Sequence, residues 1–176
     1  MTSGTTSVIA PRPRSERIEL RAITPAAAAE LAAGTGDGGF VWAPGGPYEG
    51  TRDACGMIVK AAEAGVYDPR WSAFAILRLE DGAALGGAGF HGPPNPDGSV
   101  EIGYDLAESA RGQGFATEAV GLLTAYALDV PEVSVVLAHT EPANTASQAV
   151  LLRAGFVRDG DNEDGLSRFV LVGSPS

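Results

Sequence analysis

Three short apolar segments separated by turn signals constrain the fold of this chain most strongly. Residues 71–79 are apolar on both alternating faces, which is typical of a strand in the middle of a sheet. Asp81-Gly82 is a hairpin signal and leads to a second strand at residues 84–90. A further turn precedes residues 99–106, where apolar residues occupy alternate positions. The sequence therefore predicts three consecutive antiparallel strands.

Helices and strands alternate on both sides of this meander. A strand at residues 17–23, an alanine-rich helix at 25–33 and a helix at 48–66 are expected before it. The elements expected after it are a helix from residue 116, a strand at 133–140, a helix at 144–154 and strands at 156–158 and 166–172. This order predicts one mixed α+β domain.

The composition agrees with a single folded domain. The chain has 176 residues, of which 44% are apolar, and a chain of this length buries most of its apolar surface without a staple. Residues 1–14 are rich in Thr, Ser and Pro, and we interpret them as a flexible tail before a domain at 15–173. This tail lacks the apolar stretch of a signal peptide, and no run reaches the roughly 18 apolar residues that span a bilayer. We therefore expect a cytoplasmic protein without a membrane partner.

The charge and the cysteine count exclude several classes of partner. The net charge is −10 at pH 7, so the phosphate backbone of a nucleic acid would be repelled. The same acidity is compatible with a cationic acceptor such as an amine, although acidic surfaces also serve solubility. The single cysteine, Cys55, excludes an internal disulfide and a cysteine metal cluster, and we expect no metal.

The segment that is most informative about chemistry is Arg-Gly-Gln-Gly-Phe-Ala-Thr-Glu-Ala at residues 111–119, between a strand and an amphipathic helix. Glycines allow a diphosphate to approach the main chain closely, where unpaired amides and the helix dipole bind negative charge. Arg111 adds a cation. The segment is not a P-loop, because the lysine and hydroxyl of that motif are missing, and it lacks the third glycine of the dinucleotide fingerprint.

About residues 100–156 resemble the GNAT superfamily of N-acetyltransferases, in particular the branch that includes ribosomal-protein N-terminal alanine acetyltransferases. The family pattern R-G-x-G-x-A followed by T-E-A is matched from Arg111 through Ala119. The pattern N-x-x-S with a terminal G-F is matched at Asn144, Ser147, Gly155 and Phe156. Several matches in the right order are more specific than any one of them.

The resemblance implies a GNAT fold: a twisted, mostly antiparallel sheet of six to seven strands, splayed at a V-shaped cleft and flanked by about four helices. It also implies acetyl-CoA as the co-substrate, with its pyrophosphate on the amides of residues 111–116 and its pantetheine arm between the strand ending at Leu106 and the strand at 133–140. The amide near Leu106 would polarise the acetyl carbonyl, and Asn144 would contact the pantetheine amides. The expected cofactor-binding residues are Leu106, Arg111, Gly112, Gln113, Gly114, Phe115, Ala116, Thr117, Asn144 and Ser147.

Acyl transfer to an amine requires a neutral amine, and therefore a general base or a water chain that ends on one. Glu101 is our candidate, because its position resembles that of the base in lysine-acetylating relatives; a purely structural carboxylate is the alternative. His91 and Asp105 are the other candidates for the base. His139 alternates with apolar residues, so we interpret it as a packed core histidine.

The departing thiolate needs a proton or a hydrogen bond. Many GNAT enzymes use a tyrosine seven residues after the asparagine, but this chain has Leu151 there. Ser147, one helical turn after Asn144, is then the nearest donor to the sulfur. A role in capping the helix is the alternative for Ser147.

The acceptor is expected to be a primary amine, on a small molecule or at a peptide N-terminus. The expected substrate-binding residues are Trp42, His91, Glu101 and Tyr104, with Trp42 in a glycine-rich loop over the pocket. A catalytically weak CoA-binding or sensory module is the alternative function, and the missing tyrosine favours it. The length of the acyl donor stays open, and a homodimer would be ordinary for the family.

Overall fold

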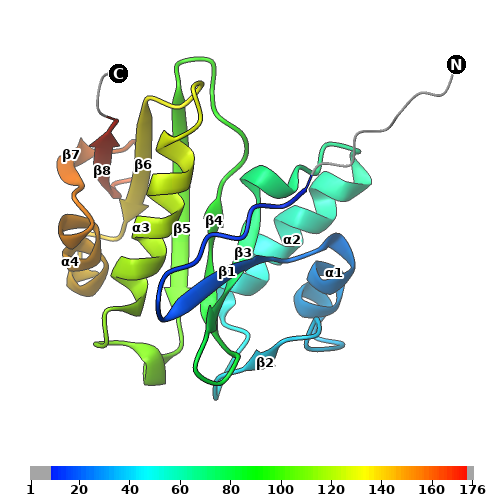
Figure 1. The fold of residues 1–176 in the computed structure, drawn as a ribbon. Coiled ribbons are helices and arrows are strands. Elements are labelled where there is room, and N and C mark those ends of the chain that lie inside the picture. The colour runs from blue at the N-terminus through cyan, green and yellow to red at the C-terminus, as the bar shows by residue number, and fades with distance from the viewer. Residues whose placement is uncertain (1–8, 174–176) are drawn as a thin grey trace, which may run out of the picture.

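The computed structural model describes residues 9–173 and contains, within them, one eight-stranded mixed sheet flanked by four α-helices (Figure 1). The strands follow the order β1-β3-β4-β5-β6-β8-β7, and β2 pairs with β4 beside this path. All neighbouring pairs are antiparallel except β2 with β4 and β5 with β6. The predicted fold class is confirmed, with β2 as an eighth strand.

The helices and strands lie close to their predicted positions. In the first half they are β1 (Ile18–Ala22), α1 (Pro25–Ala33), β2 (Val41–Trp42), α2 (Glu49–Glu63), β3 (Ala73–Arg78) and β4 (Ala83–Phe90). In the second half they are β5 (Ser99–Leu106), α3 (Phe115–Leu128), β6 (Val135–Thr140), α4 (Thr145–Arg153), β7 (Val157–Asp161) and β8 (Ser167–Val172). Two short 3₁₀ helices, Pro69–Trp71 and Glu108–Ala110, precede β3 and follow β5, so β3 begins two residues later than expected.

Local chemistry explains the first helix. The Thr24 hydroxyl accepts a hydrogen bond from the Ala27 amide at 3.2 Å, and Pro25 occupies the first turn, where a missing N–H costs nothing. Gly34 ends the helix in the left-handed conformation, with φ of 71°. These three residues explain why α1 matches its predicted bounds.

The helices cover both faces of the sheet. In β3, Phe74 and Ile76 belong to the core cluster that contains the buried residues of α3, whereas Ala75 and Leu77 belong to the cluster that contains the buried residues of α1 and α2. Figure 1 shows α3 along the front of β5 and β6, with α1 and α2 beside the β1 edge. The continuous apolar run of β3 is thus explained by burial on both faces.

The sheet parts between its two central strands. Parallel pairing of β5 with β6 runs from Ser99↔Val135 to Ile102↔Ala138 and then stops. Beyond this point β5 stays paired with β4 as far as Leu106, and β6 stays paired with β8 as far as Thr140. The predicted splay between these strands is therefore present.

Residues just before the expected domain boundary at residue 15 contact the first strand. Pro13 O accepts a hydrogen bond from the Leu20 amide at 2.8 Å, and Arg12 forms a 2.9 Å ion pair with Glu19. Residues 1–8 of the expected tail lie outside the described residues. Among the helices in the described part of the chain, none is long and apolar enough to cross a membrane.

Candidate active site

The glycine loop before α3 presents main-chain amides that have no acceptor within the described chain. Gly112 and Gly114 have φ of 74° and 83°, a conformation that favours glycine, and Gly114 is the N-cap of α3 without any side-chain cap. The Arg111 amide donates to Glu108 O and the Glu118 amide to Gly114 O, whereas the amides of residues 112–117 donate to no group in residues 9–173. Free amides at a helix N-terminus are suited to bind a phosphate.

Two arginines lie at this loop: Arg111, which belongs to it, was predicted, whereas Arg17 was not. Arg17, which precedes β1, donates to Gln113 O at 3.0 Å, pairs with Glu118 at 3.0 Å and lies over the Phe115 ring at 4.3 Å. Arg111 turns back toward the sheet, where its Nε donates to Leu106 O at 3.3 Å. Arg17 therefore holds the loop against the first strand, a role that no local motif indicates.

Main-chain groups of β5 face the gap where the sheet parts. The Ala107 amide donates to Leu85 O, and Glu101 O accepts from the His91 amide, so the odd-numbered residues bond toward β4. Because main-chain groups alternate between the two edges of a strand, the amides of Tyr104 and Leu106 point toward β6. There they lie beyond the last β5–β6 pair. Leu106 is thus placed where an amide can stabilise an oxyanion.

Across the gap, Asn144 and Ser147 occupy the start of α4. Asn144 Oδ1 caps the helix by accepting from the Ser147 amide at 3.0 Å, which leaves the amide NH₂ group of Asn144 for other partners. The Ser147 hydroxyl and the Tyr104 phenol are hydrogen-bonded at 2.7 Å, and the phenol also contacts Ser147 O at 3.1 Å. Burial raises the pKa of Tyr104, so the phenol keeps its proton at neutral pH. Leu151 is buried in the core instead.

Glu101 joins both histidines of the chain. Its Oε2 accepts from His91 Nδ1 and its Oε1 from His139 Nδ1, the latter at 2.7 Å. The hydrogen bond from His91 and the charges of the two imidazoles lower the pKa of Glu101 from its ordinary value of 4.5 against the opposing effect of burial. The carboxylate is therefore ionised at neutral pH and accepts from both rings.

The geometry leaves the far nitrogen of His91 free. An ionised carboxylate only accepts hydrogen bonds, so Nδ1 of His91 carries the proton in the neutral ring and Nε2 carries a lone pair. His91 Nε2 has no hydrogen-bond partner in the described residues, and the ring lies over Gly103. A Cβ at position 103 would lie 2.7 Å from that nitrogen, so the glycine creates the space that the ring occupies.

His139 is a side chain of the candidate site that the sequence interpretation missed. The interpretation as a packed core histidine is wrong, because Val136 and Ala138 face the core while His139 lies on the other, half-buried face. Parallel pairing of Glu101 with Leu137 places His139 two residues further along the same face. Placing His139 beside Glu101 requires the register in which β5 pairs with β6, and the sequence interpretation did not have it.

Asp105, one of the alternative candidates for the base, makes structural hydrogen bonds. Its carboxylate accepts from the Thr51 amide at 2.9 Å, the Thr51 hydroxyl at 2.5 Å and the Gly87 amide at 3.0 Å. Thr51 belongs to the first turn of α2, whose N-cap residue Tyr48 makes no side-chain cap. Asp105 therefore caps α2 from a distant strand and fixes the wall of the neighbouring cavity.

A cavity of about 540 Å³ lies between α2 and the β4–β5 face. His91, Gly103, Tyr104 and Asp105 line it on the sheet side, and it continues to Trp71. The structure therefore brings His91 and Tyr104 to one cavity, with Glu101 directly behind His91. Trp42 is not brought to it: the indole donates to Asp37 O at 2.9 Å and packs against Phe40.

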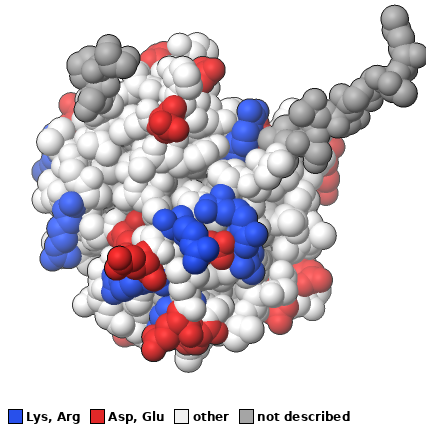
Figure 2. Space-filling view, in the orientation of Figure 1, with Lys and Arg blue, Asp and Glu red and all other residues white. Residues whose placement is uncertain are grey.

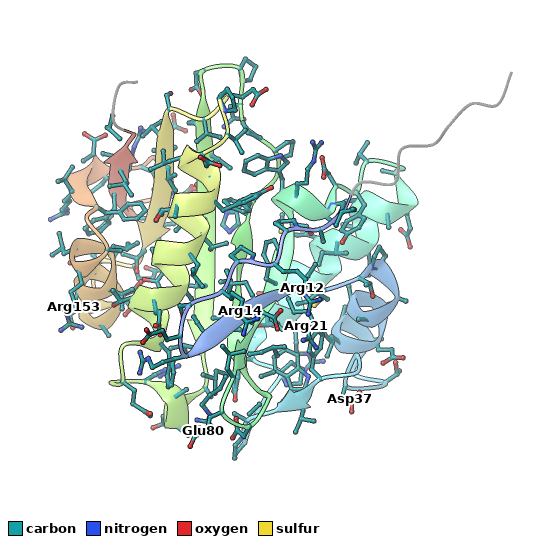
Figure 3. The ribbon with its side chains drawn as sticks, in the orientation of Figure 1. Arg12, Arg14, Arg21, Asp37, Glu80 and Arg153 are labelled. Carbon is teal, nitrogen blue, oxygen red and sulfur yellow. The ribbon has the colours of Figure 1, made fainter. Side chains whose placement is uncertain are left out.

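Positive charge gathers away from this cavity. Figure 2 shows blue side chains in the middle of the face in view, and Figure 3 identifies Arg12, Arg14 and Arg21 there, along β1. Arg12 and Arg21 both pair with the buried Glu19. None of these three arginines lines the cavity.

The parted sheet and the open amides beside it are the features that the resemblance to N-acetyltransferases predicted. The acetyltransferase (GNAT) domain matches residues 17–157, and the chain belongs to this family. The predicted family and enzyme class are thereby confirmed, and members of this family use acetyl-CoA.

Relatives support the same family. The uncharacterized N-acetyltransferase YjdG of Bacillus subtilis (strain 168) is 33% identical over 87 residues, which are 49% of this chain and 52% of that protein. The chain spans about half the length of the curated relatives it matches.

Solved structures agree with the fold. The acetyltransferase from Agrobacterium tumefaciens str. C58 superposes with a TM-score of 0.64 at 25% identity, over 93% of this chain and 95% of that one. RimL, a ribosomal L7/L12 alpha-N-protein acetyltransferase in complex with coenzyme A, gives a TM-score of 0.64 at 17% identity over 93% of this chain and 98% of that one. The latter likeness concerns the fold alone.

Proposed function

We propose that the protein transfers an acetyl group from acetyl-CoA to a primary amine, on a small molecule or a peptide N-terminus, by direct attack. The observation that carries the proposal is the row of acceptor-free amides at residues 112–117 beside the parting of β5 and β6. The pyrophosphate binds these amides, and the pantetheine arm enters the gap toward Leu106 and Asn144. A loop whose amides were already paired would not support this assignment.

The acceptor is deprotonated at His91. Nε2 of His91 takes a proton from the amine, and Glu101 holds the ring through Nδ1 and stabilises the imidazolium that forms. This arrangement gives the lowered pKa of Glu101 a function, since a weakly basic carboxylate orients an imidazole better than it removes a proton from an amine. Glu101 acts through His91, and His139 occupies its second oxygen.

The neutral amine then attacks the acetyl carbonyl, and the developing oxyanion is stabilised by the amide of Leu106. When the carbon–sulfur bond breaks, the thiolate accepts a hydrogen bond from the Ser147 hydroxyl, which the Tyr104 phenol supports at 2.7 Å, and it takes the proton that the attacking nitrogen loses as the amide forms. Ser147 and Tyr104 thus supply the hydrogen-bond donor that Leu151, at the position of the family tyrosine, cannot supply. The imidazolium returns its proton to solvent, because His91 is about half exposed.

Two variants test the proposal, and calorimetry measures the binding of acetyl-CoA alongside them. His91→Gln is expected to lower turnover about 100-fold, because glutamine offers no nitrogen lone pair that can take the proton from the amine. Glu101→Gln is expected to lower turnover less, because the amide oxygen still accepts a hydrogen bond from His91 Nδ1.

The opposite order, in which Glu101→Gln lowers turnover more than His91→Gln does, would make the carboxylate the base, directly or through water. Thiol release that is absent with every amine, despite tight binding of acetyl-CoA, would leave a binding module. No binding of acetyl-CoA at millimolar ligand would refute the function itself.

A further inference from the structure

The cavity next to His91 has an apolar wall and an apolar rim. Its wall includes Ile58, Trp71 and Phe90, which are buried or nearly so. Its rim includes Met57 and Val66, which are 57% and 70% exposed. Large apolar side chains that are exposed at the edge of a cavity indicate a surface that an apolar ligand covers.

The charges of the cavity have one sign. Asp53, Asp68 and Asp105 line it, and among its lining residues in the described chain there is neither Lys nor Arg. The Asp105 carboxylate already accepts hydrogen bonds from two amides and a hydroxyl, and Asp68 forms an ion pair with Arg70 at 2.7 Å. Asp53, on α2, has no hydrogen-bond or ion-pair partner within residues 9–173. The Arg70 guanidinium is itself bound to Asp68 through Nε and Nη2.

From this combination we infer the class of acceptor, an inference that rests on the proposed function. The acceptor is a primary amine on an apolar body without a neighbouring carboxylate or phosphate. Its ammonium form is attracted by Asp53 and reaches His91, and its apolar part lies against α2 and Trp71. A free amino acid would bring its carboxylate into a cavity that offers no cation, and the uncompensated charge would be rejected.

The test compares three amines with one side chain: phenethylamine, L-phenylalaninamide and L-phenylalanine. The first two should exceed L-phenylalanine in kcat/KM by about tenfold or more, because only the third carries the anion. L-phenylalanine used as well as its amide would overturn the inference. The tripeptide Phe-Gly-Gly distinguishes the two sources of this chemistry: its acetylation in preference to phenethylamine identifies a peptide N-terminus, and the reverse identifies a small amine.

A charge reversal inside the cavity provides the matched control. Asp53→Lys should raise the use of L-phenylalanine relative to its amide about tenfold, since it supplies a cation. Glu63→Lys changes the net charge equally on the same helix, but Glu63 does not line the cavity, so its ratio should match that of the parent protein. Equal ratios in both variants would contradict the inference.

Equilibrium binding separates this inference from the proposed function. If no amine is acetylated, binding of phenethylamine and L-phenylalanine to the CoA-saturated protein still compares the two ligands. Tighter binding of phenethylamine supports the inference although catalysis has failed. Equal binding, or no binding of either, refutes it.

Discussion

At the scale of single residues, the candidate site depends on an absent side chain. Gly103 lies between Glu101 and Asp105 on the same face of β5, and the His91 ring fills the space that a side chain would take. The close approach brings His91 Nδ1 to the carboxylate while Nε2 stays free. A glycine in the interior of a strand is thus explained by the approach of a functional group.

Gly103→Ala is expected to lower kcat/KM ten- to a hundredfold, roughly what a displacement of about 1 Å costs a catalytic group. Stability should change by less than about 1 kcal/mol, since the half-exposed ring can rotate away. Gly121→Ala, in α3, is the control: no atom lies within 4 Å of the added Cβ, so activity should persist and stability should rise by roughly 0.5–1 kcal/mol. Steady-state kinetics with urea unfolding checks both, and full activity of Gly103→Ala would show that the position of His91 is unimportant.

The sequence predicts some residues of this site and not others. Glu101 was predicted because its position resembles that of the base in lysine-acetylating relatives, and Ser147 because it lies three residues after Asn144. Arg17 and His139 were not found, because their contacts bridge 101 and 38 residues of sequence and depend on how strands pair. Pairing register is a tertiary property that alternation along one strand cannot supply.

At the scale of elements, α2 is held by a residue that is not part of it. Tyr48 offers no side-chain cap, and the cap comes from Asp105, 54 positions beyond Thr51. By contrast, α1 is capped by its own Thr24. This difference explains why the start of α1 can be read from local sequence, whereas the cap of α2 cannot.

Asp105→Ala should lower the free energy of unfolding by about 3 kcal/mol, because three hydrogen bonds to a partly buried carboxylate are lost and the donors are left unpaired. Guanidinium denaturation is the measurement. Asp81→Ala serves as the control, since Asp81 pairs with Arg78 in an exposed hairpin and its loss should matter much less. Equal losses in the two variants would show that the hydrogen bonds of Asp105 stabilise the fold no more than an exposed ion pair does.

At the scale of the whole molecule, the order of strands and helices was predictable from apolar periodicity and glycine positions. The two-residue β2 was not, since Val41 and Trp42 are too few to show alternation. The parting of the sheet was predicted from the family resemblance. In the structure, the pairing of β5 with β6 ends at Ile102 and Ala138. The proposed binding of acetyl-CoA depends on this gap and on the glycine loop beside it.

Acetyl-CoA at a hundred times its Kd should stabilise the fold by about 2.7 kcal/mol, seen as a rise in Tm, and high salt should weaken the effect. Gly112→Ala should lose most of this rise. Gly82→Ala is a matched control, because both glycines have φ of 74° and open space around the added Cβ. Both variants should lose similar stability without ligand, and a full rise in Gly112→Ala would contradict the placement of the phosphate.

The sequence contains two histidines, and both contact the same carboxylate. Every imidazole resonance of the protein in an NMR spectrum therefore comes from the candidate site, with no background from elsewhere in the chain. Protonation at the reacting centre can be followed in the unmodified protein, without a label or a probe, while donor and acceptor are added in turn.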